Sequence, residues 1–144
     1  MLMNSRKERL RLWRFDGLPA VRVRAAEQVA HHRSRLITFH VSTSEFRTAV
    51  RPDVLEEFGA VPQMQRQQQI GIMGSAALAR AWRAPGVVFG NLVLPNVLFW
   101  VHPLETLPEG ISGVLGLDVL ERVGAIINLR ENWLTVHPEE PEPA

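Results

Sequence analysis

The segment 113–120, Gly-Val-Leu-Gly-Leu-Asp-Val-Leu, carries most of the information about the fold of this chain. Its first half is apolar and rich in glycine, which favours a buried strand, whereas Asp118 is of a type that caps helices and Glu121 follows three positions later. We therefore expect a strand that leads into a short helix, with Asp118 at the N-cap and Gly124 just past the last turn. Asp118 then has a structural role.

Two β-rich runs follow this helix, at 125–129 and 133–136, and the polar residues between them suit a hairpin turn. Glutamate and proline dominate from residue 138 onward and exclude a packed element. We expect a closing hairpin and then a disordered acidic tail over 138–144.

The chain before residue 113 is also predicted to be mostly β. Apolar residues alternate with polar ones at 21–25 and at 37–41, the period of half-buried strands, and the polar stretch 27–34 predicts a loop between them. Pro52 and Gly59 bracket a segment expected to form one or two helical turns.

Short apolar pieces fill residues 70–102, separated by pairs such as Pro85-Gly86 and Pro95-Asn96, after a polar, glutamine-rich stretch at 63–69. Glycine and proline at these intervals predict a meander of short strands.

Composition narrows the class of protein. The chain has 144 residues, 46% hydrophobic, with a formal net charge of +1 and no cysteine. These values describe a globular domain without disulfides, thiolate metal sites or a cysteine nucleophile. No apolar run is long enough for a membrane span or a signal peptide, so we expect a cytoplasmic protein. The basic residues at 1–17 predict a solvated N-terminal arm.

These features together resemble the retropepsin-like aspartic proteases of bacterial type. The apolar-Gly-Leu-Asp segment before a helix resembles the C-terminal half of such a domain, and 70–83, with Gly74-Ser75 at its middle, resembles the flap hairpin. A further strand pattern at 90–97 resembles that of bacterial members. The resemblance covers about residues 18–136 and implies an all-β fold, a small barrel with one or two short helices in a domain at 18–137, in which Gly116 and Asp118 are structural.

The catalytic motif departs from the family pattern. The strand at 36–41 runs into Ser42-Thr43-Ser44, where the family carries Asp-Thr/Ser-Gly. Active members pair one aspartate from each of two subunits as general base and acid, and a serine hydroxyl does not accept a proton near neutral pH. Asp16-Gly17 is the competing alignment, but it lacks the intervening Thr or Ser and no apolar strand is expected before it.

The function expected from this pattern is a non-catalytic, protease-like homodimer that binds an extended peptide or partner segment in the cleft between subunits. Thr43 then lies near the twofold axis. The expected flap residues in contact with the peptide are Met73, Gly74, Ser75, Ala76 and Trp82. The alternatives are an active aspartic endopeptidase, using an unrecognised acid or an Asp-bearing partner subunit, and a purely structural dimer whose own flap fills the cleft.

Other chemistries are less favoured by the sequence. His40 and Ser42 lie on one face of the expected strand, but no orienting carboxylate or nucleophile elbow accompanies them. Glu27, His31 and His32 suit a solvated loop better than a metal site. We expect no cofactor or metal, and neither nucleic acid nor a membrane as a partner.

Overall fold

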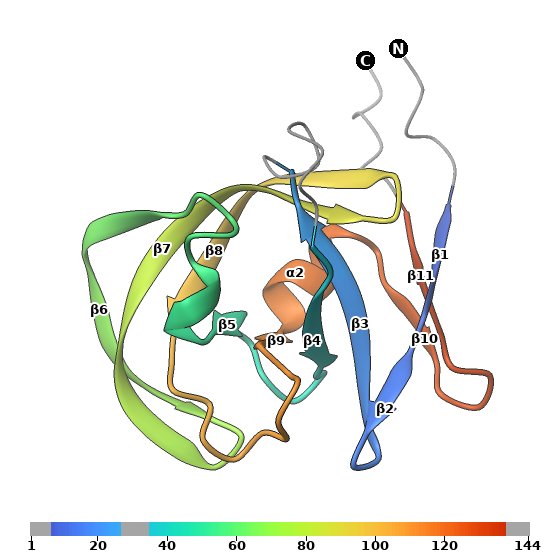
Figure 1. The fold of residues 1–144 in the computed structure, drawn as a ribbon, viewed down its shortest axis with the longest axis horizontal. Coiled ribbons are helices and arrows are strands. Elements are labelled where there is room, and N and C mark those ends of the chain that lie inside the picture. Colours follow the sequence, from blue (N-terminus) through green and yellow to red (C-terminus); the bar gives the residue numbers. More distant parts are fainter. Residues whose placement is uncertain (1–6, 27–34, 138–144) are drawn as a thin grey trace.

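The computed structural model describes residues 7–26 and 35–137, and most of these lie in β-strands (Figure 1). The elements, in chain order, are β1 (Glu8–Arg11), β2 (Trp13–Phe15), β3 (Leu18–Ala25), β4 (Ile37–Val41), β5 (Ala49–Val50), a 3₁₀ helix (Pro52–Val54), β6 (Val61–Ile72), β7 (Ser75–Phe89), β8 (Leu92–Val101), β9 (Gly113–Leu115), α2 (Leu117–Arg122), β10 (Ile126–Asn128) and β11 (Trp133–Val136). The expected all-β fold with short helices is confirmed.

The larger sheet has an order that does not follow the sequence. Its strands run β2-β3-β4-β9-β5-β8-β7-β6, and β3 also pairs with β7. β9 lies between β4 and β5, parallel to the first and antiparallel to the second. The segment 42–48, which joins β4 to β5, therefore has to pass the end of β9, and this brings it against the start of α2.

The core is built from the alternating residues of these strands. Phe39, Phe58 and Phe99 are buried and pack edge to face or tilted, with ring centroids 5.0–6.1 Å apart. Aromatic pairs prefer such geometries because the edge of one ring meets the electron-rich face of the next. Because Phe39 is in β4, Phe99 is in β8 and Phe58 follows the 3₁₀ helix, their packing connects these three parts of the chain.

The N-terminal residues differ from the expected solvated arm. β1 pairs with β11 and β2 pairs with β3, so residues 8–15 are part of the sheets, and β1, β11 and β10 form a second sheet in that order. Leu12, between β1 and β2, is 2% exposed. Alternation of leucine with arginine in this run gives it one apolar face, which the core covers.

Some element boundaries also differ from expectation. Only Pro52–Val54 forms a 3₁₀ turn within the predicted helix at 52–58, and the glutamine-rich stretch belongs to the long strand β6. β7 continues through Pro85 and β8 continues through Asn96, because the residues on both sides of these two positions pair in the same register. A proline removes one ladder hydrogen bond without ending a strand that long-range pairing supports.

The early strands and the closing hairpin form where they were expected. The residues at 21–25 and 37–41 lie in β3 and β4, which pair antiparallel, and β10 pairs with β11. The predicted loop at 27–34 and tail at 138–144 lie outside the described residues. Within the described part of the chain, no helix is long and apolar enough to cross a membrane.

Candidate functional site

The segment Ser42-Thr43-Ser44 follows β4 directly, at the point where the strand leaves β9. The backbone N–H of Ser42 donates to the Leu115 carbonyl at 3.0 Å, and the Ser42 side chain is buried. Its Oγ lies 3.0 Å from Ser44 Oγ and accepts from the Ser44 N–H at 3.3 Å. The Ser42 hydroxyl is thus held in a local turn, whereas Thr43 is exposed.

His40 does not act on this hydroxyl. Its Nδ1 donates to the Pro19 carbonyl at 2.8 Å, across the β3–β4 pair, and its side chain is buried. The Ser42 hydroxyl is hydrogen-bonded to Ser44 and not to His40. The geometry gives no support to a serine nucleophile.

Asp16 and Gly17 form the tight turn between β2 and β3. Both have positive φ angles, 51° and 83°, and the flanking residues Phe15 and Leu18 are paired. Such two-residue turns are typical of β-hairpins, and aspartate followed by glycine is a preferred sequence for them. Contrary to expectation, a strand, β2, does lead into Asp16. Asp16 and Gly17 nevertheless form only a turn, at an edge of the larger sheet.

Asp118 is held by Thr48, a contact that the sequence did not reveal. Thr48 Oγ1 donates to Asp118 Oδ1 at 2.6 Å, the Thr48 N–H donates to Oδ2 at 3.2 Å, and Gly116 N–H donates to Thr48 Oγ1 at 3.0 Å. Thr48 is fully buried. A buried hydroxyl that both donates and accepts is fully satisfied, so this network fixes the 42–48 segment to the start of α2.

The predicted N-cap role of Asp118 is wrong in its position. Gly116 is the N-cap of α2, and Asp118 lies in the first turn, where its Oδ1 also accepts from the Val119 N–H at 2.8 Å. A carboxylate in the first turn is favoured by the helix dipole. Close packing of Gly116 against the 42–48 segment leaves no room for a side chain at the cap, so the carboxylate that binds Thr48 sits two residues later.

The turn of the β6–β7 hairpin lies against the same segment. Met73 and Gly74 form the turn, with φ angles of 51° and 82°, and the Met73 N–H donates to Glu45 Oε1 at 3.0 Å. Thr106 Oγ1 donates to the Met73 carbonyl at 2.8 Å. Glu45 and Thr106 were not singled out in the sequence, because nothing local to either of them indicates a partner so distant along the chain.

His102 is hydrogen-bonded to the β6–β7 turn through Ser75. It is fully buried; its Nδ1 accepts from the Leu104 N–H, which leaves Nε2 to donate to the Ser75 carbonyl, both at 3.0 Å. Of the expected flap residues, Met73, Gly74, Ser75 and Ala76 lie together at this turn. Trp82 lies apart from them, in the middle of β7 opposite Pro62 and Phe99.

Two pockets flank the 42–48 segment. One of about 200 Å³ lies beside Thr43 and is lined on its other sides by residues of α2 and of the chain leading into β10: Leu117, Leu120, Glu121, Gly124, Ala125 and Ile127. The other, of about 300 Å³, lies on the far side of Asp118 and is lined by Phe46, Arg47, Asn96, Leu98, Trp100, Asp118, Val119 and Arg122.

The described residues contain no group of three or more His, Asp or Glu side chains placed to hold a metal ion. Glu27, His31 and His32 lie outside the described residues. The hydrogen bonds of the Ser42 hydroxyl are to the Ser44 hydroxyl and N–H, while the Glu45 and Asp118 carboxylates accept from Met73 and from Thr48 and Val119.

Comparison with known proteins agrees with this architecture. No protein-family model matches the chain, and no curated protein matches its sequence. The crystal structure of a retropepsin-like aspartic protease from Rickettsia conorii aligns with a TM-score of 0.60 at 19% identity, covering 92% of each chain. The retroviral protease-like domain of Ddi1 from Leishmania major aligns with a TM-score of 0.55 at 15% identity, covering 86% of this chain and 94% of that one. The strand order, the inserted strand β9 and these alignments together give this chain the retropepsin-like aspartic protease fold.

Proposed function

We propose that this chain is a non-catalytic relative of the retropepsin-like proteases that binds an extended peptide without cutting it. The observation that carries the proposal is Ser42 at the end of β4, with its hydroxyl bonded to Ser44. By the resemblance of the sequence to the family, Ser42 takes the place of the catalytic aspartate. A hydroxyl in that place supplies no general base for water, a contribution of roughly 10²–10⁴-fold per catalytic group.

The carboxylates of Glu45, within the 42–48 segment, and of Asp118, which binds Thr48 of that segment, support the proposal. Asp118 accepts from Thr48 and Val119, and Glu45 accepts from Met73 at the hairpin turn. Both carboxylates thus have structural hydrogen-bonding roles within the chain. The hairpin turn contacts the 42–48 segment through Met73 and Glu45, and among the described residues β6 of this hairpin is the last strand of the larger sheet, so its edge suits strand addition of a peptide.

The test is the double variant Ser42→Asp, Ser44→Gly, which restores the family motif. We expect wild type to retain peptides from a randomised library without producing fragments across acidic and neutral pH, as followed by mass spectrometry. The double variant should cleave at acid pH at least about 100-fold faster than wild type, and a statine-type transition-state analogue should block it.

Three outcomes would contradict this proposal. Cleavage by wild type that is lost in Ser42→Ala would assign catalysis to the serine, and cleavage lost in Glu45→Gln would favour an unrecognised acid. No binding of any library peptide by a correctly folded wild type would favour the purely structural role.

We also propose that the chain forms a twofold homodimer through the surface beside Thr43. The pocket there has apolar walls from Leu117, Leu120 and Ile127. Next to it, β10 is an edge strand of the smaller sheet, and Ile126 is 57% exposed. Exposed apolar side chains beside an unpaired strand edge favour association, and a second copy would cover both.

Thr43→Glu tests the dimer. In a symmetric interface each copy would bring a new carboxylate near Glu121, which lines the same pocket, and like charges juxtaposed in an interface cost several kcal/mol. We expect the dimer dissociation constant from sedimentation equilibrium to rise by about 100-fold. Gln69→Glu adds the same charge on the exposed side of β6 and should leave the dimer unchanged. Equal affinities for Thr43→Glu and wild type would place the interface elsewhere.

A further inference from the structure

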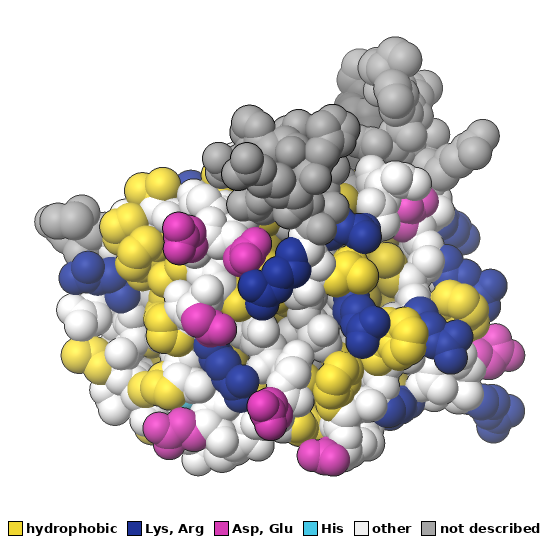
Figure 2. Space-filling model, viewed as in Figure 1, with side chains coloured by type: hydrophobic (Ala, Val, Ile, Leu, Met, Phe, Trp, Pro, Cys, Tyr) yellow, Lys and Arg dark blue, Asp and Glu magenta, His cyan; other side chains and the backbone are white. Residues whose placement is uncertain are grey.

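A row of arginine and tryptophan side chains covers the outer face of β1 and its neighbours. Its members, here called the Arg–Trp face, are Arg9, Arg11, Trp13, Arg22 and Trp133. Figure 2 shows dark blue and yellow side chains alternating over this part of the molecule, on the right of the view. None of these residues belongs to the segment 42–48 or to the hairpin turn, so the Arg–Trp face is separate from the site described above.

The sheet register places these side chains on one face. Residues 9, 11 and 13 are two apart along the extended chain and therefore point the same way, while Leu10 and Leu12 point into the core. Trp133 pairs directly with Arg11. Trp13 pairs with Ala20, two residues before Arg22, which brings Arg22 to the same side.

The tryptophan rings hold the guanidinium groups in place. The Arg9 guanidinium carbon lies 4.1 Å from the Trp133 ring centroid, and those of Arg22 and Arg11 lie 4.2 Å and 5.2 Å from the Trp13 ring centroid. Stacking on an aromatic ring is favourable for a guanidinium and leaves its N–H donors free at the edge of the plane. These arginines are therefore ordered before any partner binds, which lowers the entropy cost of binding.

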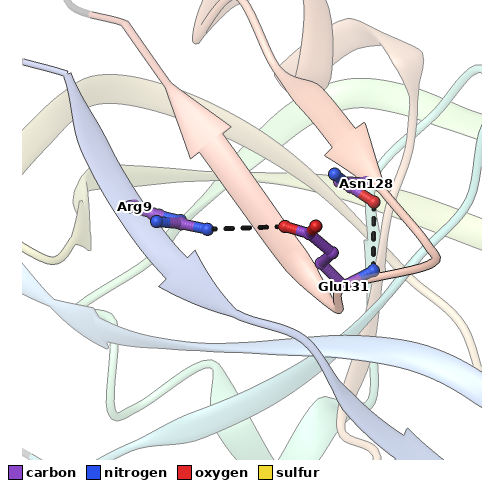
Figure 3. Close-up of polar contacts among 3 residues, drawn as sticks. All are labelled: Arg9, Asn128 and Glu131. Atoms are coloured by element: carbon purple, nitrogen blue, oxygen red, sulfur yellow. Dashed lines mark hydrogen bonds and ion pairs between the residues drawn. The ribbon is translucent and has the colours of Figure 1, made fainter.

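Little negative charge opposes these arginines. Arg9 lies 3.9 Å from Glu131, with both side chains more than half exposed, and Asn128 Oδ1 accepts from the Glu131 N–H at 3.0 Å (Figure 3). An exposed pair at this distance contributes little to stability. Among the described residues, no carboxylate lies within 4.0 Å of the Arg11 or Arg22 guanidinium. The face thus presents ordered cations with spare hydrogen-bond donors.

β1 adds a second feature to this face, because it is an edge strand. Among the residues that the structure describes, β1 pairs with β11 on one side and with no strand on the other, in the sheet order β1-β11-β10. Residues two apart on a strand are roughly 6.5–7 Å apart, and a peptide added alongside would present its own alternate side chains at the same spacing. Arg9 and Arg11 therefore match carboxylates at alternate positions of an extended segment.

We propose that the Arg–Trp face binds an extended acidic segment of a partner protein, which lies along β1 with alternate carboxylates on Arg9 and Arg11. Arginine favours such contacts because its planar fork binds a carboxylate through two hydrogen bonds. A protein segment fits better than single-stranded nucleic acid, because two guanidinium groups already flank the Trp13 ring on which a base would stack. The proposal does not depend on peptide binding at the hairpin or on the homodimer.

The experiment uses the whole chain and a fluorescein-labelled peptide of alternating Glu and Thr, followed by fluorescence anisotropy at low ionic strength. We expect saturable binding that weakens as salt is added. The double variant Arg9→Gln, Arg11→Gln should bind at least about tenfold more weakly, since arginines at such contacts commonly contribute more than 1 kcal/mol. The matched control, Arg80→Gln with Arg83→Gln on exposed positions of β7, removes the same charge and should bind as wild type.

Three results would overturn the proposal. These are wild-type affinity in the Arg9, Arg11 variant, equal losses in the β7 control, and tighter binding of a labelled oligothymidylate than of the acidic peptide. Circular dichroism and sedimentation of the same variants separate a folding defect or a lost dimer from a lost contact. If the Arg9, Arg11 variant loses binding of the acidic peptide but still forms the dimer, the function proposed for the hairpin and the homodimer is unaffected.

Discussion

Gly116→Ala is expected to destabilise this chain by about 3 kcal/mol or more, one of the two largest effects that we predict. A Cβ built on Gly116 would lie 2.6 Å from the Arg47 carbonyl oxygen and 2.8 Å from that of Phe46. Both atoms are backbone, so they cannot rotate away as a side chain could. The φ of Gly116 is −94°, so the cost arises from packing and not from a left-handed conformation.

The displaced segment would also lose hydrogen bonds. Leu117 N–H donates to the Glu45 carbonyl at 2.8 Å, and Asp118 N–H donates to the Phe46 carbonyl at 3.0 Å. A shift that accommodates the methyl group would lengthen both of them and disturb the Thr48–Asp118 contact. Buried groups left without partners cost about 1–3 kcal/mol each, which is why we expect a large effect from a single methyl group.

Urea denaturation measures this effect, and Gly71→Ala is its matched control. Gly71 lies in β6, and a Cβ there would meet nothing within 4 Å. We expect its free energy of unfolding to stay within about 0.5 kcal/mol of wild type, because alanine fits and also restricts the unfolded chain. A Gly116→Ala variant as stable as Gly71→Ala would show that the 42–48 segment is not packed on the start of α2.

Phe99→Ala is expected to lower the free energy of unfolding by about 3–5 kcal/mol. Phe99 is fully buried, with its ring centroid 5.0 Å from that of Phe58 and 6.0 Å from that of Phe39. Truncation removes its apolar contacts and leaves a cavity between rings that come from three different parts of the chain. Densely packed surroundings collapse only partly into such a cavity.

The same denaturation experiment with Phe46→Ala provides the control. Phe46 is 63% exposed, and the variant keeps the backbone carbonyl that accepts from Asp118. A substitution at such a surface position is expected to change stability by no more than about 0.5 kcal/mol. Similar losses for Phe46→Ala and Phe99→Ala would contradict the arrangement of the core described here.

The candidate site was predictable only in part. The period-2 pattern of 37–41 predicted the strand that ends at Ser42, and β4 forms there. The glycine-rich segment predicted the buried strand β9, but the close approach of other chain atoms to Gly113 and Gly116 is seen only in the structure. The partners that define the site were not predictable: Glu45 binds the hairpin turn and Thr48 binds Asp118, 70 residues away.

The structure of the N-terminal residues 8–15 also depends on a partner that is distant along the chain. The basic residues of this run predict a solvated arm, although alternation of leucine with arginine is also compatible with a half-buried strand, and the presence of a partner strand decides between these outcomes. β11, more than a hundred residues later, supplies that strand and orders Arg9 and Arg11 on one face. The Arg–Trp face is therefore a property of the sheet, although every residue in it can be read from the sequence.

The sequence by itself determined part of the local structure: the strands β3 and β4, the closing β10–β11 hairpin and the place of α2. Those features depend on side-chain alternation and on residues that favour turns, which act over a few neighbouring positions. The tertiary structure alone decided that β9 lies between β4 and β5, that Asp118 binds Thr48 instead of capping its helix, and that β1 pairs with β11. Such pairings reflect the free energy of the whole core, because a strand or carboxylate with several compatible partners takes the one that the complete fold brings to it.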